Sequence, residues 1–179
     1  HDGFTMQTLP LTLNTPRRRR PRWWVRGIAR GLAAALMALL SSAGLEAQQR
    51  KLIFQIGARS DEADAGDYQG MGERWIDFDS NLTRKPVRLH ALWLAHADAN
   101  APVLLYLHGA RWDLRGSVQR MQQLHEHGFS VLGIDYRGFG RSSAELPCER
   151  SACEDAHAAW RWLAAQHPQA KRYLFGHSL

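Results

Sequence analysis

Apolar and polar positions between residues 75 and 108 follow the patterns of β-strands. Residues 75–79 (WIDFD) and 87–96 (VRLHALWLAH) alternate between apolar and polar side chains, as in a strand with one buried face. Residues 102–108 (PVLLYLH) are apolar almost throughout, which indicates a strand buried on both faces. The turn-forming residues 98–101 (DANA) separate the last two segments. The pattern therefore predicts three strands.

A helix and a further buried strand are predicted next. Four apolar side chains, at spacings of four, three and three residues, lie on one face of this helix: Leu114, Val118, Met121 and Leu124. Gly128 is placed to end the helix, because glycine readily adopts the left-handed conformation after a last turn. Residues 129–136 (FSVLGIDY) are again mostly apolar and predict the strand.

A second amphipathic helix leads to the last predicted strand. Ser151 and Glu154 form a capping box that opens this helix, and Pro168 follows its end. The predicted inner face consists of Ala152, Ala156, Ala159, Trp160 and Leu163. Trp162 lies on another face and is expected at the surface. Residues 173–175 (YLF) predict a short final strand.

The order of these elements indicates an α/β fold. Three apolar strands separated by two amphipathic helices predict a parallel sheet with right-handed crossover connections. The two alternating strands that precede them are expected to form an antiparallel edge of the same sheet. This folded region is expected to span residues 73–179.

The positive charge of the chain is confined to its N-terminal tail. The formal net charge is +6, and residues 1–30 hold seven arginines against one aspartate. Residues 31–179 hold equal numbers of basic and acidic side chains. The folded region therefore lacks the basic footprint of a nucleic-acid-binding protein, and no nucleic-acid partner is expected.

Residues 31–47 are predicted to act as a signal peptide or membrane anchor. An uncharged segment (GLAAALMALLSSAGL) follows the arginines of the basic tail 1–30, and small residues follow it. Arginines on its N-terminal side would stay in the cytoplasm, so the remainder is expected to be exported, periplasmic or extracytoplasmic, and associated with the membrane. The alternatives are a buried helix and a nucleic-acid-binding arm. Residues 48–72 are polar and predict a linker.

Cys148 and Cys153 are the only cysteines, with four residues between them. In an oxidising compartment they could form a disulfide, and two ordinary thiols are an equal alternative. Two cysteines without suitably spaced histidines are too few for a closed zinc site, so no metal is expected.

The last four residues of the chain are the strongest indication of a catalytic function. Gly176, His177, Ser178 and Leu179 follow the last predicted strand and match the first four positions of G-x-S-x-G. In that motif, a serine on a tight strand-to-helix turn exposes its hydroxyl as a nucleophile.

Two more segments lie where the same chemistry needs them. His108, Gly109, Ala110 and Arg111 follow the first buried strand, where a loop amide could stabilise an oxyanion. Residues 135–142 (DYRGFGRS) form a glycine-rich turn after the next strand, at the edge where open α/β sheets bind ligands.

Three segments in this order, LLYLHGARW, VLGIDYRGFGRSS and YLFGHSL, resemble the N-terminal half of an α/β-hydrolase. The most similar subgroup is that of the Bem46-like and serine-aminopeptidase-like hydrolases. The resemblance covers residues 73–179 and implies an α/β-hydrolase fold, truncated at the nucleophile turn behind the N-terminal apolar segment.

The resemblance also implies roles for individual residues. Ser178 would be the nucleophile, and the backbone amides of Leu179 and Ala110 would form the oxyanion hole. His108 and Gly109 would shape the oxyanion loop. No metal or organic cofactor is implied. In this family the catalytic acid and histidine follow the nucleophile, so we expect the chain to be an N-terminal fragment that is inactive alone.

The expected function is that of a serine hydrolase, which cleaves a small-molecule carboxylic ester, thioester or amide through an acyl-enzyme. The alternatives are a non-catalytic, membrane-associated binding protein and an acyltransferase on the same scaffold.

Other polar residues have simpler expected roles. Asp135 is expected to be a turn residue, and Arg137 and Arg141 stabilise that turn or meet an anionic substrate. The remaining histidines are expected at the surface or in packing contacts: His90, His96, His125, His127, His157 and His167.

Overall fold

The computed structural model describes residues 23–54, 68, 70–111 and 113–178. The chain divides into two compact units, residues 1–43 and 44–179. Helix α1 (Trp23–Ile53) starts in the first unit and ends in the second. It begins within the predicted basic tail (residues 1–30) and ends within the predicted linker (residues 48–72). In the part of the chain described, no helix has the length and apolar character needed to cross a membrane.

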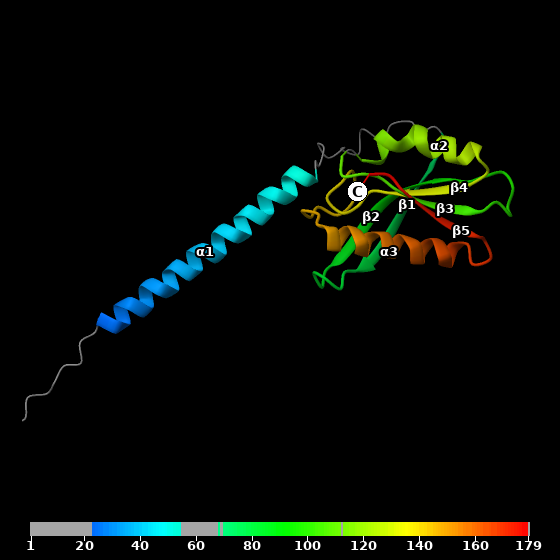
Figure 1. Ribbon diagram of the computed structural model, residues 1–179. Helices are drawn as coiled ribbons and strands as arrows, with labels where there is room; N and C mark the ends of the chain where they lie inside the picture. Colours follow the sequence, from blue (N-terminus) through cyan, green and yellow to red (C-terminus); the bar gives the residue numbers. More distant parts are fainter. Residues whose placement is uncertain (1–22, 55–67, 69, 112, 179) are drawn as a thin grey trace, which may run out of the picture. The chain divides into compact units, whose positions relative to one another are not determined.

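The second unit is built on a five-stranded sheet in the order β1-β2-β4-β3-β5 (Figure 1). The strands are β1 (Gly72–Asp79), β2 (Pro86–Leu94), β3 (Val103–Leu107), β4 (Ser130–Ile134) and β5 (Arg172–Gly176). Strand β3 pairs in parallel with β4 and β5, whereas β1 and β2 are antiparallel to their neighbours. The predicted α/β fold and its antiparallel edge are confirmed.

Helices cover both faces of this sheet. The 3-10 helix η2 (Leu114–Ser117) leads into α2 (Val118–Glu126), and α3 (Glu149–Gln166) lies on the opposite face (Figure 1). The chain moves from β3 to its neighbour β4 in one direction across the sheet, and from β4 past β3 to β5 in the other. Right-handed crossovers therefore place their helices on opposite faces.

The apolar side chains of the central strands alternate between the two faces. Leu105 and Leu132 pack with Leu163 of α3, whereas Tyr106 and Val131 belong to the cluster beneath α2. Because successive residues of a strand point to opposite sides, one apolar run fills both cores. This explains why β3 and β4 read as nearly continuous hydrophobic segments in the sequence.

The start of α3 differs from the prediction. The helix begins at Glu149, and Cys148 caps it in a reciprocal arrangement with Ser151. Glu154, expected to complete the capping box, instead accepts hydrogen bonds from the Ser80 hydroxyl (2.7 Å) and the Asn81 amide (2.6 Å). Cys148 and Ser151 therefore supply the local cap, while Glu154 binds the β1–β2 turn.

The structure also decides two other expectations about α3, which concern its cysteines and its tryptophans. Cys148 and Cys153 are free thiols, so the disulfide alternative is not realised in this structure. Trp160 and Trp162 are both partly buried against the core, and the prediction of one surface tryptophan was wrong. The core cluster therefore contacts side chains from more than one face of this helix.

Arg137 is a buried structural cation. Its guanidinium is fully buried and donates to Asp155 (2.6 and 2.8 Å) and Glu154 (2.6 Å). These contacts decide between the two predicted roles of Arg137, because a side chain surrounded by carboxylates is not available to an anionic substrate.

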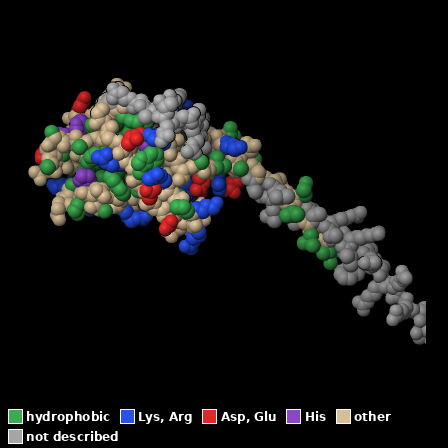
Figure 2. All heavy atoms as spheres, turned by 180° about the vertical axis from the view of Figure 1, so that it is seen from behind, with side chains coloured by type: hydrophobic (Ala, Val, Ile, Leu, Met, Phe, Trp, Pro, Cys, Tyr) green, Lys and Arg blue, Asp and Glu red, His purple; other side chains and the backbone are tan. Residues whose placement is uncertain are grey.

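Acidic and basic side chains are interspersed on the visible face of residues 44–179 in Figure 2, in keeping with their even balance in the sequence.

Candidate active site

Ser178 lies on a strained turn at the end of β5. The amide of His177 donates to the carbonyl of Leu107 (3.0 Å), which continues the parallel pairing past the strand end. Ser178 then adopts a φ of +50°, in the left-handed region that non-glycine residues rarely occupy. Such strain concentrates at functional sites, and a serine on this strand-end turn projects its side chain away from the sheet.

The predicted oxyanion loop contacts this turn directly. A Cβ atom at Gly109 would lie 2.5 Å from the carbonyl oxygen of Ser178 and 2.9 Å from that of His177. Only glycine fits such a contact without displacing backbone. The structure therefore brings together the two segments, one after β3 and one after β5, that the sequence predicts to act together.

His108 supports the loop from below. The residue is buried, and its ring packs edge-on against Tyr136 and Phe139, with centroids 4.9 and 5.1 Å away. Its Nδ1 lies 2.7 Å from the carbonyl oxygen of Gly109. Because a carbonyl only accepts, this contact places the proton of the neutral ring on Nδ1. Burial lowers the pKa of His108, although the nearby Asp135 carboxylate opposes that shift.

A cavity of about 330 Å³ opens beside Ser178. Its lining includes Gly109 and Ala110 of the loop, together with Arg111 and Arg120. No acidic side chain among the described residues lines it, so the cavity carries net positive charge. Arg120 is partly held in place, because its guanidinium donates to the Tyr106 hydroxyl at 3.4 Å. The motif analysis did not single out Arg120, whose position on α2 offered no signal.

The other parts of the predicted site are only partly described. Ala110 lies in the cavity wall, whereas Leu179, the second predicted amide donor, lies outside the described residues. Among the residues that the structure describes, no histidine or carboxylate hydrogen-bonds to the Ser178 hydroxyl. The described residues thus place the predicted nucleophile beside the predicted oxyanion loop and supply no base for it.

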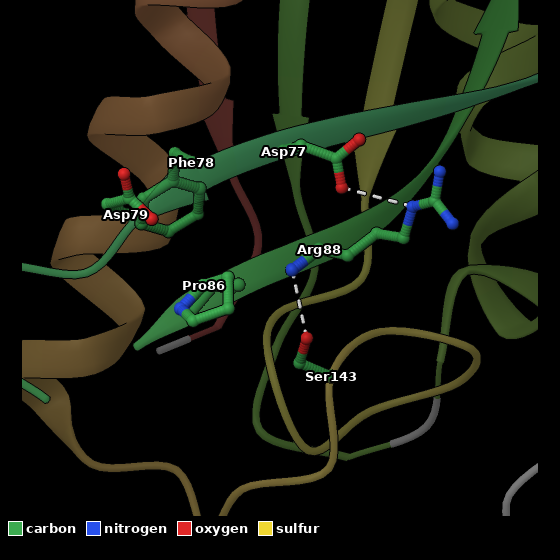
Figure 3. Close-up of a pocket in the computed structure, with 7 residues that line it drawn as sticks. Asp77, Phe78, Asp79, Pro86, Arg88 and Ser143 are labelled. Carbon is green, nitrogen blue, oxygen red and sulfur yellow. Dashed lines mark hydrogen bonds and ion pairs between the residues drawn. The ribbon is translucent and has the colours of Figure 1, made fainter. Parts of the chain in front are cut away.

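A second cavity lies away from this site, at the end of β1 and the start of β2 (Figure 3). Its polar groups bind one another: Arg88 pairs with Asp77 at 3.0 Å, and the Arg88 amide donates to the Ser143 hydroxyl at 2.9 Å. It offers no nucleophile beside a base, so the candidate site remains the one around Ser178.

Comparison with known proteins agrees with this geometry. The family model described as serine aminopeptidase, S33, matches residues 98–179, from the turn before β3 to the end of the chain. The fold is shared with a probable hydrolytic enzyme from Pseudomonas aeruginosa, at a TM-score of 0.53, 23% identity, 69% coverage of this chain and 38% of the other. The fold of the chain is therefore that of the α/β-hydrolases.

Its curated relatives include lipases. It is 32% identical over 108 residues to lysophosphatidylserine lipase ABHD12 of Danio rerio, covering 59% of this chain and 28% of that protein. It is 36% identical over 80 residues to protein ABHD12B of Homo sapiens, covering 44% of this chain and 22% of that protein. The chain thus matches less than a third of the length of these relatives.

Proposed function

We propose that the protein containing this chain is a serine hydrolase that cleaves carboxylic esters, thioesters or amides with Ser178 as its nucleophile. The observation that carries the proposal is the contact between Gly109 and the strained turn at Ser178, with its φ of +50°. This contact puts a hydroxyl and a loop of backbone amides against the same cavity, as acyl transfer requires. The α/β-hydrolase fold of the chain and its similarity to the serine aminopeptidase family over residues 98–179 support it.

The reaction follows from these groups. The Ser178 oxygen attacks the substrate carbonyl carbon while a histidine, supplied from outside the described residues and oriented by an acid, takes the hydroxyl proton. The amides of Ala110 and Leu179 donate to the resulting oxyanion. The leaving group departs with that proton and leaves an acyl group on Ser178. Water then attacks the acyl-enzyme, which releases the acid and restores the serine.

The charge of the cavity favours an ester with an anionic group near the scissile bond. Arg111 and Arg120 line the cavity and form no ion pair with a described carboxylate. Guanidinium groups bind phosphate and carboxylate well because they donate two parallel hydrogen bonds. The lysophosphatidylserine lipases among the relatives are named for a substrate of this kind. We therefore propose anionic lysolipids as the substrate class.

Labelling and turnover by the full-length protein test both parts. A fluorophosphonate probe should label the wild-type protein and not Ser178→Ala, while Ser143→Ala, which alters a serine in the second cavity, keeps full labelling. Arg120→Gln should lower kcat/KM for an anionic lysolipid about tenfold relative to a neutral ester, as loss of roughly 1.4 kcal/mol would. Labelling that survives in Ser178→Ala would refute the proposed nucleophile.

Export also remains our proposal. Residues 31–47, within α1, are proposed to direct the protein out of the cytoplasm, because residues 31–45 are uncharged and follow a cluster of arginines. Fractionation of expressing cells, followed by N-terminal sequencing of the mature protein, tests this. Full-length protein in the cytoplasmic fraction would contradict it.

A further inference from the structure

Both ends of the oxyanion loop meet one buried carboxylate. Asp135 directly follows β4 and is 2% exposed. The amide of Leu114, where the loop enters η2, donates to its Oδ1 at 2.8 Å. The Nε2 atom of His108, where the loop leaves β3, lies 3.7 Å from the same oxygen. Asp135 therefore binds one end of the loop that carries Ala110 and lies beside the other end.

The second oxygen of Asp135 is fixed from the opposite side. The Nδ1 atom of His90, a fully buried residue of β2, lies 2.8 Å from Oδ2. The other ring nitrogen of His90 lies 3.3 Å from Glu73 of β1, and Glu73 in turn binds Arg141. A chain of polar contacts thus links the surface at Arg141 to the underside of the loop.

The backbone around Asp135 leaves its carboxylate no room to move. A Cβ atom at Gly140, which has a φ of +48°, would lie 2.2 Å from Oδ2. Ser142 donates its hydroxyl to the Asp135 carbonyl at 2.6 Å. An ionised carboxylate is costly to bury unless donors surround it, and here the donors come from β2 and from the loop. The arrangement holds the carboxylate in one place.

These contacts do not form a catalytic pair. The His90 ring lies between Asp135 and Glu73, and its two nitrogens face these carboxylates rather than the Ser178 hydroxyl. His108 commits Nδ1 to Gly109 and leaves Nε2 with no hydrogen-bond partner among the described residues. Asp135 therefore acts on the reaction through the loop and touches no reacting atom.

We propose that Asp135 is a positioning residue that aims the Ala110 amide at the substrate oxyanion. The inference rests on the proposed function, since it assigns a role within the same reaction. Oxyanion donors act only when they are correctly placed, and loss of one lowers kcat by roughly 10²–10³. A small shift of the loop is expected to weaken the donor without abolishing substrate binding.

The test is Asp135→Asn in the full-length protein, a change that keeps the shape and removes the charge. We expect kcat for a p-nitrophenyl ester to fall about 10–100-fold, with KM changed less than about twofold. Binding of a trifluoromethyl ketone, which forms an oxyanion on the nucleophile, should weaken by the same factor as kcat. If Asp135 had only a structural role, kcat and the affinity for the ketone would not fall by the same factor.

Asp155→Asn is the matched control, because it makes the same change in another buried carboxylate, one that binds Arg137 away from the loop. Each variant is assayed well below its own melting temperature. If Asp135→Asn does not fold, Gly140→Ala is used instead, because the added methyl group would displace the Asp135 carboxylate without altering it chemically. Should Asp155→Asn not fold, Glu154→Gln alters the same arginine cluster.

The outcomes separate the two proposals. The wild-type protein must first turn over ester and be labelled at Ser178, and failure there contradicts the proposed function. Given an active wild type, unchanged kcat and ketone affinity in the Asp135 variant would overturn the positioning role. An equal loss in the Asp155 control would overturn it too, since the effect would then reflect stability alone.

Discussion

Individual residues at the site are constrained by backbone contacts more than by side-chain chemistry. Gly109 has no side chain because the Ser178 carbonyl occupies the space a Cβ would need. Ser178 itself tolerates a left-handed φ because the pairing of His177 with Leu107 directs the chain into the turn. The reactivity proposed for the Ser178 hydroxyl thus depends on neighbouring residues that contribute only backbone contacts.

The buried imidazole of His108 should make stability depend on pH. Its folded-state pKa is lowered by burial, so the unfolded chain, with a histidine pKa of about 6.5, binds the proton more readily. Stability is therefore complete above that pH and is lost as the pH falls through it, by up to about 1.4 kcal/mol per pH unit. Urea unfolding of wild type and His108→Gln between pH 8 and 5 measures this, and the variant should show the smaller slope. Equal slopes would show that His108 does not contribute.

Among the elements, α3 is joined to the sheet by the ion pairs of Arg137. The guanidinium lies beyond the end of β4, and Asp155 and Glu154 come from successive positions of α3. Ser80 of the β1–β2 turn also lies 3.3 Å from it. Burial raises the pKa of Asp155, while the hydrogen bonds from Arg137 oppose that shift. One side chain thus ties three segments that are distant in the sequence.

Removing that cation should be costly. Arg137→Leu leaves the buried Asp155 carboxylate without its charged partner, and we expect a loss of about 3–5 kcal/mol in the free energy of unfolding. The double variant Arg137→Leu, Asp155→Leu should recover part of this loss, because it removes the unpaired charge as well. Arg161→Gln, on an exposed position of α3, serves as the control and should change stability by less than about 0.5 kcal/mol. Urea unfolding measures all three, and a wild-type-like Arg137→Leu would contradict the assignment.

At the scale of the whole molecule, β5 is the exposed edge of the described sheet. It pairs only with β3 among the described strands, and Tyr173, Leu174 and Phe175 are 47%, 57% and 37% exposed. Unpaired backbone groups and apolar side chains on one edge favour association with another chain. At β5 the chain therefore exposes backbone groups and apolar side chains that a typical monomer would cover.

We expect the 179-residue chain to associate through this edge. Leu174→Lys places a charge on β5 and should lower the apparent mass, or the light scattering, at a given concentration. Leu82→Lys makes the same change at a 38% exposed position in the β1–β2 turn and should leave association unaltered. Analytical ultracentrifugation over a concentration series compares them. A monomeric wild-type chain at high concentration would contradict the expectation.

Several side chains were assigned correctly as to element but not as to role. Asp135 follows a predicted strand, yet nothing in its neighbours shows that Leu114 and His90 converge on its two oxygens. Glu154 satisfies the spacing of a capping box, but the Ser80 turn and Arg137 lie close enough to bind it instead. Spacing rules describe contacts within one element, whereas these carboxylates are bound by segments far away in the chain.

The order of strands and helices, the parallel centre of the sheet and the pairing of the Gly109 loop with the Ser178 turn were determined by the sequence alone. Local periodicity and the handedness of crossovers leave little choice in these features. The burial of Arg137, the cationic cavity with Arg120 and the link from Asp135 to the Leu114 amide were decided only by the tertiary structure. Each depends on groups from segments distant in the sequence, because a buried charge must find its partners wherever folding brings them.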